Sequence, residues 1–218
     1  MSVAISEALR VWSDPTQHHF RWARRARVAA RMCRGEQWVC DLGCGMQFLK
    51  SFLPRTAVYL PADLKQWTED TELCDLDAGR LPTRSLDLCS ICVLLGVIGH
   101  LRDPEALIQG LSQRVEKVLI AFTTTDFTRK GRAQDRARAY ALSEMYAMLD
   151  RAGFRITDQR QYVHNTMIKA QSERFDAASR ELRDKIRAAF APNRRTLADE
   201  WIRLLLQLRT APTAFQRI

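Results

Sequence analysis

The chain has 218 residues, of which 46% are hydrophobic and 27% are charged. These values are typical of one globular domain with an appendage, and they exclude a chain too polar to bury a core. No apolar run approaches the roughly 18 residues that a membrane-spanning helix needs, and the first residues lack the basic start and apolar stretch of a signal peptide. We therefore expect a cytoplasmic protein.

Positive charge is concentrated in the C-terminal part of the sequence. Residues 1–128 contain 15 Lys and Arg against 15 Asp and Glu, whereas residues 129–218 contain 19 against 10, which accounts for the net charge of +9. Such a segment favours an anionic partner, which would be nucleic acid, a phosphorylated substrate or an anionic lipid surface. Because the charges are interspersed, a solvated, arginine-rich helical surface is the simpler interpretation.

The six cysteines favour reduced thiols over a metal site. Four of them, Cys40, Cys74, Cys89 and Cys92, lie in apolar runs typical of strands, where a free cysteine packs as a small hydrophobic residue. Cys89 and Cys92 have the spacing of a metal or redox pair. On a strand, however, residues three apart point to opposite faces, and no second Cys or His pair complements them. We predict no metal site.

The N-terminal residues 2–34 predict two helices separated by Asp14-Pro15. The second helix spans about residues 16–33 and ends at Gly35, and six arginines lie between Arg21 and Arg34. The sequence leaves open whether these helices form a lid over a ligand or a plain N-terminal extension.

Strands and helices then alternate, which predicts a parallel sheet with helices on both faces. The polar, basic residues 123–137 leave the carboxyl end of a strand and predict a substrate-facing loop. A helix starting at Ser143 leads into an antiparallel edge hairpin whose turn is His164-Asn165. From Gln171 the apolar period is helical, with a break at Pro192-Asn193. The predicted strands are 38–42, 58–63, 72–74, 86–93, 118–122, 155–163 and 166–170, and the intervening helices are 46–53 and 104–111.

A glycine turn follows the first predicted strand in the segment Asp41-Leu42-Gly43-Cys44-Gly45. Glycine permits a positive φ and lets a ligand approach where a Cβ would clash. Asp63 lies 22 residues after Asp41, at the end of the second apolar run. An acidic residue at about this distance reaches ribose hydroxyls in βαβ nucleotide-binding folds. A dinucleotide dehydrogenase is disfavoured, because Phe48 stands where its third glycine would fall.

These features resemble the class I S-adenosylmethionine-dependent methyltransferases over about residues 36–170. The segment from Leu94 to Leu107 resembles the family's segment after the fourth strand, and Ala152-Gly153-Phe154 resembles its late helix-to-strand turn. The resemblance implies a Rossmann-like, doubly wound α/β fold with a mostly parallel seven-stranded sheet, an antiparallel edge hairpin, and N-terminal and C-terminal helices. Two residues depart from the pattern: Gln47 replaces the third glycine, and Gly99 replaces an acidic residue.

The resemblance also implies S-adenosyl-L-methionine as cofactor and assigns roles to single residues. Asp41, Gly43 and Gly45 match the turn around the methionine end of the cofactor. Asp63 matches the acid that holds the ribose, and Asp75 the residue that bonds the adenine amine. The residues expected to bind the cofactor are Asp41, Gly43, Gly45, Asp63, Leu64, Asp75, Leu76 and Leu94.

His100 is the candidate general base, because it follows the fourth strand at the edge of the crevice and its usual pKa of about 6.5 suits proton removal near neutral pH. The alternative is a histidine packed at a helix start. His18, His19 and His164 rank lower. Asp87, at the start of a predicted strand, is expected to be structural.

Residues 59–64 and 74–79 are similar to a bacterial subgroup of this family associated with polysaccharide and sugar-modifying pathways. The resemblance therefore implies O-methylation of a polar small molecule or saccharide. The sequence keeps two alternatives open: an RNA methyltransferase that uses the basic C-terminal region, and a non-catalytic, methyltransferase-like partner subunit. The predicted parts are N-terminal helices over residues 1–35, a methyltransferase domain over 36–170 and a C-terminal helical extension over 171–218. That extension is a candidate surface for a homodimer or a partner protein.

Overall fold

The computed structural model describes residues 21–126, 138–163 and 165–190. The chain divides into two compact units, Met1–Asp176 and Ala177–Ile218, and the described part of the second unit is the helix α6 (Ala177–Phe190). Every helix within these described ranges is too short or too polar to span a bilayer. The predicted parts 1–35, 36–170 and 171–218 remain a prediction.

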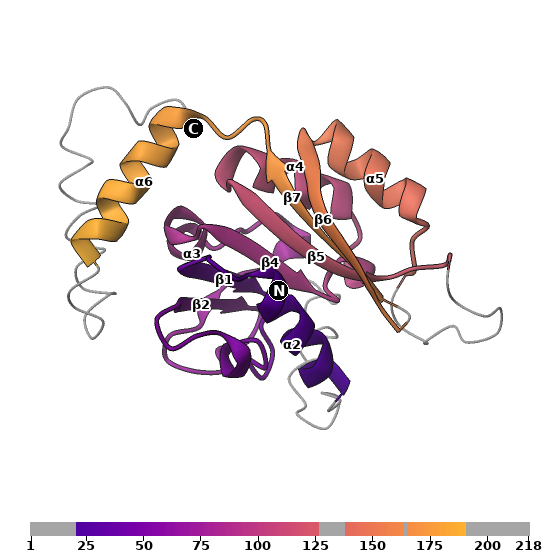
Figure 1. Cartoon of the computed structure of the whole chain (residues 1–218), viewed down its shortest axis with the longest axis horizontal. Helices are drawn as coiled ribbons and strands as arrows, with labels where there is room; N and C mark the ends of the chain where they lie inside the picture. The colour runs from indigo at the N-terminus through magenta and orange to yellow at the C-terminus, as the bar shows by residue number, and fades with distance from the viewer. Residues whose placement is uncertain (1–20, 127–137, 164, 191–218) are drawn as a thin grey trace. The chain divides into compact units, whose positions relative to one another are not determined.

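The first unit is built on one seven-stranded sheet with the strand order β3-β2-β1-β4-β5-β7-β6 (Figure 1). Strands from β3 to β5 are parallel, whereas β7 pairs antiparallel with both β5 and β6. The predicted Rossmann-like sheet with an antiparallel edge hairpin is therefore confirmed. The strands are β1 (Trp38–Leu42), β2 (Val58–Asp63), β3 (Glu72–Leu73), β4 (Ile91–Leu95), β5 (Lys117–Thr123), β6 (Phe154–Tyr162) and β7 (Asn165–Ser172).

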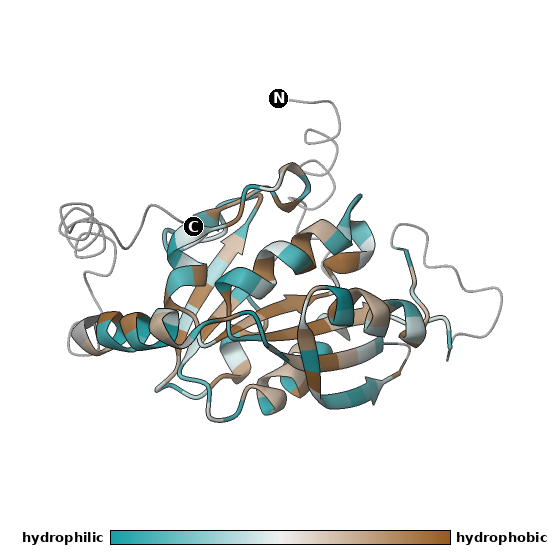
Figure 2. Cartoon of the chain, turned by 90° about the horizontal axis from the view of Figure 1, so that it is seen from above, coloured by the Kyte–Doolittle hydropathy of each residue, from teal (hydrophilic) through white to brown (hydrophobic). Residues whose placement is uncertain are grey.

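Helices cover both faces of this sheet. Buried Ala26, Ala29 and Met32 of α2 pack in one cluster with residues of β1, β4, β5 and β7 such as Val93 and Met167. The opposite face carries α4, where Ser172 Oγ of β7 donates to the Ser112 carbonyl at 2.5 Å. Figure 2 shows the largely hydrophobic central strands among helices that carry both hydrophobic and hydrophilic residues. The helices of this unit are α2 (Arg21–Met32), α3 (Thr83–Leu88), α4 (Pro104–Arg114) and α5 (Leu142–Arg151), and the 3₁₀ turns are η2 (Lys50–Phe52), η3 (Leu76–Ala78) and η4 (Ile98–His100).

The predicted strand over residues 86–93 was wrong in its first half. Residues Thr83–Leu88 form α3, and β4 starts only at Ile91. The Glu72 carboxylate accepts from the Arg84 and Ser85 backbone N–H groups at 3.1 and 2.8 Å, and so caps this helix from the far edge strand. Such a distant cap leaves no local signal in the sequence. Asp87 therefore lies in a helix, where it pairs with Arg114 at 3.2 Å.

Other predicted elements differ in length or lie outside the described residues. The predicted helix over 46–53 is reduced to η2, and the C-terminal helical period starts at Ala177 because Gln171 and Ser172 belong to β7. The helix predicted before Asp14, the loop 127–137, His164 and the helix after Pro192 fall outside the described residues.

Candidate functional site

The glycine turn after β1 is attached to the end of β2 by its backbone. The Gly43 and Cys44 N–H groups donate to the Ala62 carbonyl at 2.8 and 3.2 Å. The Gly45 N–H donates to Asp63 Oδ2 at 2.8 Å. The structure thus brings together Gly43, Gly45 and Asp63, three residues predicted to share a site.

Gly43 is required by both its conformation and its surroundings. Its φ is +72°, in the left-handed region, and a Cβ at this position would lie 2.5 Å from Cγ2 of Val97. Val97 follows β4, so the loops after β1 and β4 meet here. A side chain at residue 43 would push these two loops apart.

Gln47 takes the place of a third glycine and keeps a glycine-like backbone. Its φ is +57°, which is costly for a residue with a side chain. The side chain is buried, and its Nε2 donates to Thr68 Oγ1 at 2.8 Å and to Thr71 Oγ1 at 3.3 Å. These hydrogen bonds hold the turn against the loop that follows β2, so the substitution preserves its shape.

Asp41 is a buried carboxylate at the carboxyl end of β1. It is 2% exposed, and its Oδ2 accepts a hydrogen bond from the Tyr59 hydroxyl at 2.6 Å. Burial raises the pKa of Asp41 to about 7; the Tyr59 hydrogen bond and the charge of Arg25 lower it, and the charge of Asp63 adds to the rise. Within the described ranges Asp41 makes no ion pair. A cation next to it would therefore be strongly favoured.

Arg25 of α2 is a candidate site residue that the sequence did not single out, and its charge acts on Asp41. Its guanidinium occupies the space above Gly96, the residue after β4, so that a Cβ at Gly96 would collide with it. Its Nε is buried and has no hydrogen-bond partner among the described residues, and burial lowers its pKa to about 10. The signal in the sequence was an arginine on the apolar side of the second N-terminal helix, among six arginines of which most are exposed.

Asp75 lies beyond the end of β3, and its carboxylate is partly used by its own loop. Oδ1 accepts from the Ala78 N–H at 3.1 Å and Oδ2 from Arg80 at 3.0 Å. A carboxylate accepts about four hydrogen bonds, so two positions remain for a ligand. Leu76 starts η3 directly after Asp75 and is half-buried.

The remaining predicted residues, Leu64, Leu94 and His100, differ in how far they are buried. Leu64 follows Asp63 and is half-buried. Leu94 is fully buried in β4 between β1 and β5, and is a core residue. His100 ends η4, is half-buried, and lies next to Gly99, whose carbonyl accepts from the Arg138 N–H at 2.8 Å.

The cysteines are packed in the interior. All six are buried and none forms a disulfide, and burial raises the pKa of Cys40, Cys74 and Cys92, which keeps these thiols protonated. Cys89 ends α3, so the argument from strand geometry does not apply to it. Among the described residues no cluster of His, Cys, Asp and Glu could hold a metal ion.

The chain is similar in structure to several solved proteins. No family model and no curated protein matches the chain. A chain in the complex between the Haloferax volcanii Trm112 methyltransferase activator and a methyltransferase is similar with a TM-score of 0.57, at 13% identity, over 77% of this chain and 94% of that one. Magnesium protoporphyrin IX methyltransferase from Synechocystis, with bound SAH, is similar with a TM-score of 0.55, at 14% identity, over 79% and 95%. An S-adenosylmethionine-dependent methyltransferase from Mesorhizobium loti is similar with a TM-score of 0.52, at 14% identity, over 66% and 96%.

Proposed function

The chain has the fold of the class I S-adenosylmethionine-dependent methyltransferases, and we propose that it transfers a methyl group from S-adenosylmethionine to an oxygen of a polar small molecule or saccharide. The observation that carries this proposal is the pair formed by Asp41 and Arg25. Among the described residues, the buried Asp41 carboxylate has no ion pair within 4 Å and the buried Arg25 Nε has no hydrogen-bond partner, and the two groups lie near enough to affect each other's pKa where the loops after β1 and β4 meet.

The amino-acid end of the cofactor is a zwitterion, and this pair has the complementary charges. Arg25 would hold the carboxylate of the cofactor, since a guanidinium binds carboxylates strongly. Asp41 would attract its ammonium and sulfonium charges. Gly43 and Gly45 would allow the close approach of that end to the backbone. Each buried charge would thereby gain a direct ionic contact in addition to the longer-range interaction between Arg25 and Asp41.

The nucleoside end would lie along the ends of β2 and β3. The Asp63 carboxylate accepts from the Gly45 N–H at Oδ2 and from the Lys65 N–H at Oδ1, at 3.4 Å, and it would also accept from the ribose hydroxyls. Asp75 would accept the adenine amine with the positions left free by Ala78 and Arg80. The hydrogen bond between Asp63 and Gly45 would make the ribose and methionine ends of the site depend on each other.

When bound, the cofactor supplies an activated methyl group on a sulfonium. The residues of the chain must align the acceptor and exclude water. We assign His100 to the acceptor side, where it would orient the hydroxyl group or remove its proton. Its position in the segment that follows β4, which also contains Gly96 and Gly99, supports this assignment.

The test compares two ligands, S-adenosylhomocysteine and methylthioadenosine, by titration calorimetry. Methylthioadenosine lacks the amino-acid end. Replacing Arg25 with Met should weaken S-adenosylhomocysteine binding by about 10-fold and methylthioadenosine binding by less than about twofold. Asp63→Ala should weaken both ligands, by about 1–3 kcal/mol, because it leaves polar groups unpaired.

The matched control is Arg24→Met, since Arg24 is exposed on the same helix. Equal effects of Arg25→Met on both ligands would refute the role of Arg25. No binding of either ligand by the wild-type protein would refute the cofactor. Methyl transfer is then measured with labelled cofactor on saccharides and hydroxylated small molecules, and His100→Ala should lower kcat more than it lowers cofactor affinity.

A second candidate is an RNA methyltransferase, favoured by the nine excess positive charges of residues 129–218. In the described part of this region α6 has internal ion pairs, Lys185 with Glu181 at 2.7 Å and Arg187 with Asp184 at 2.8 Å, which reduce the charge available to a polyanion. This candidate requires RNA binding that weakens steeply with salt. Binding that is absent or insensitive to salt would dismiss it.

A further inference from the structure

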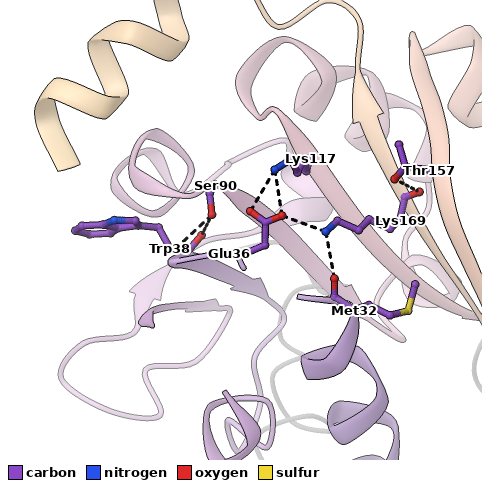
Figure 3. A network of polar contacts seen from close by, with 7 residues as sticks. All are labelled: Met32, Glu36, Trp38, Ser90, Lys117, Thr157 and Lys169. Atoms are coloured by element: carbon purple, nitrogen blue, oxygen red, sulfur yellow. Dashed lines mark hydrogen bonds and ion pairs between the residues drawn. The ribbon is translucent and has the colours of Figure 1, made fainter. Parts of the chain in front are cut away.

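Glu36 is the centre of a polar network on the face of the sheet that α2 covers (Figure 3). Glu36 is 8% exposed, and its Oε1 lies 3.1 Å from both Lys117 Nζ and Lys169 Nζ. Lys117 Nζ also lies 3.4 Å from Oε2, and Lys169 Nζ donates to the Met32 carbonyl at 3.2 Å. The network thus joins the end of α2 to β5 and β7.

This network contains more positive charge than the buried carboxylate needs. One ammonium group neutralises Glu36, so the second is in excess. Arg31, on the last turn of α2, is exposed and has no ion-pair partner among the described residues. Arg160 is paired with Asp158 at 3.4 Å, which cancels their charges. Lys117, Lys169, Arg31 and Arg160 against Glu36 and Asp158 leave two positive charges, four minus two.

The excess charge faces a hollow of about 360 Å³, which we name the basic hollow. Side chains alternate along a strand, so Met167 lies under α2 while Lys169 and Gln171 follow on the same face. The sheet therefore turns from apolar to charged where α2 ends. The charged residues that line the hollow are Arg31, Lys117, Asp158, Arg160 and Lys169.

We infer that the basic hollow binds a phosphoryl group, most favourably a phosphate monoester. The two excess positive charges match the charge of about −1.5 to −2 that a phosphate monoester carries at neutral pH, whereas a carboxylate would neutralise only one of them. Arg31 supplies a guanidinium, and the two ammonium groups retain N–H donors that Glu36 and Met32 do not use. The volume is at the lower end of the range of about 300–1,000 Å³ for small-ligand pockets.

The basic hollow is separate from the proposed cofactor site. Lys117 is the first residue of β5, whereas Asp41, Asp63 and Gly96 lie at the carboxyl ends of their strands. Since β1, β4 and β5 are parallel, the two sites are at opposite ends of the sheet. A ligand in the basic hollow would therefore be an effector or an anchoring group, and not the acceptor of the methyl group.

The test is a titration of the full chain with inorganic phosphate. Binding is monitored by NMR or calorimetry, and the ionic strength is kept constant with chloride. Wild-type protein should show saturable binding. The double variant Arg31→Gln, Lys117→Met should lose at least about 10-fold in affinity, because Lys169 still neutralises Glu36 while the excess charge is removed. The matched control is Arg34→Gln, an exposed arginine beyond α2 that does not line the hollow, with a change of less than about twofold.

Two further measurements make the result decisive. A 5′-phosphorylated and an unphosphorylated oligoribonucleotide separate the two sources of a phosphoryl group: preference for the first indicates a monoester, and equal binding of both indicates a polynucleotide backbone. Either outcome supports a phosphoryl-binding site, provided that the double variant abolishes the binding of the oligoribonucleotides. Absent saturation with phosphate, or unchanged binding by the double variant, overturns the inference. S-adenosylhomocysteine should not compete with phosphate, so failure here and failure of the proposed function are measured separately.

Discussion

Asp41, within β1, and Glu36, two residues before β1, are both buried carboxylates, yet their surroundings are opposite. Glu36 contacts two ammonium groups at 3.1 Å, whereas Asp41 has a phenol hydrogen bond and no ion pair within the described ranges. The contacts of Glu36 join α2 to the sheet and leave an excess of positive charge. Asp41 has no ion pair that balances its negative charge, and its pKa rises to about 7. The comparison teaches that a buried acid can hold a fold together or prepare a site for a cation, depending on its partners.

The largest expected effect comes from Glu36→Gln. This change leaves two ammonium groups in a partly buried position without their counter-charge, and should lower the free energy of unfolding by about 3–5 kcal/mol. Urea denaturation measures it. The control is Glu69→Gln, an exposed glutamate. A loss no greater than that of the control would mean that the network does not hold α2 to the sheet.

For Asp41 we expect the opposite: its charged form should destabilise the protein, so the free energy of unfolding should depend on pH. Its folded pKa of about 7 lies above the unfolded value of 3.8, so the native state binds the extra proton between these values. The stability of the wild-type protein should therefore fall, relative to Asp41→Asn, as pH rises from about 4 to about 7, and the difference should be constant above pH 7. Its size is on the order of 2–4 kcal/mol.

Denaturation of both proteins at pH 4.5, 6 and 8, without ligand, measures this difference. The comparison of Asp41 with Glu36 is broken if Asp41→Asn destabilises the protein at pH 8, because Asp41 would then be a structural acid as well. It is sharpened if the variant is as stable as wild type or more so, and at the same time binds S-adenosylhomocysteine about 10–100-fold more weakly.

Backbone shape at the glycine turn gives a smaller effect. Gly43→Ala forces a side chain into a positive φ and into Val97, whereas Gly79→Ala has a similar φ of +68° and no atom within 4 Å of the new Cβ. The conformational cost is therefore matched, at about 1 kcal/mol, and Gly43→Ala should lose about 1–3 kcal/mol more through overpacking. Urea denaturation of both variants gives this difference, and equal losses would show that Val97 moves aside freely.

Much of this molecule could be predicted from its sequence, and the exceptions share a physical cause. The glycine turn, the spaced Asp63 and the strand periodicity are local patterns, and they predicted the sheet and the neighbours Gly43, Gly45 and Asp63. The α3 helix was missed because the residue that caps it, Glu72, lies on the strand β3. Arg25 was missed because α2 places it over Gly96, and the network around Glu36 because Lys117 and Lys169 are 81 and 133 residues away.

Gln47 provides the smallest test, since it lies at the same turn but combines a costly backbone with compensating contacts. Gln47→Ala keeps the positive φ and loses the hydrogen bonds to Thr68 and Thr71, so it should destabilise the protein by about 1–2 kcal/mol. Gln47→Gly loses the same hydrogen bonds but relieves the backbone, which should recover about 1 kcal/mol. Thermal unfolding of both variants measures the difference. If alanine and glycine are equally stable, the backbone cost at residue 47 is negligible, and the turn after β1 is held by side chains, as the Glu36 end of the sheet is.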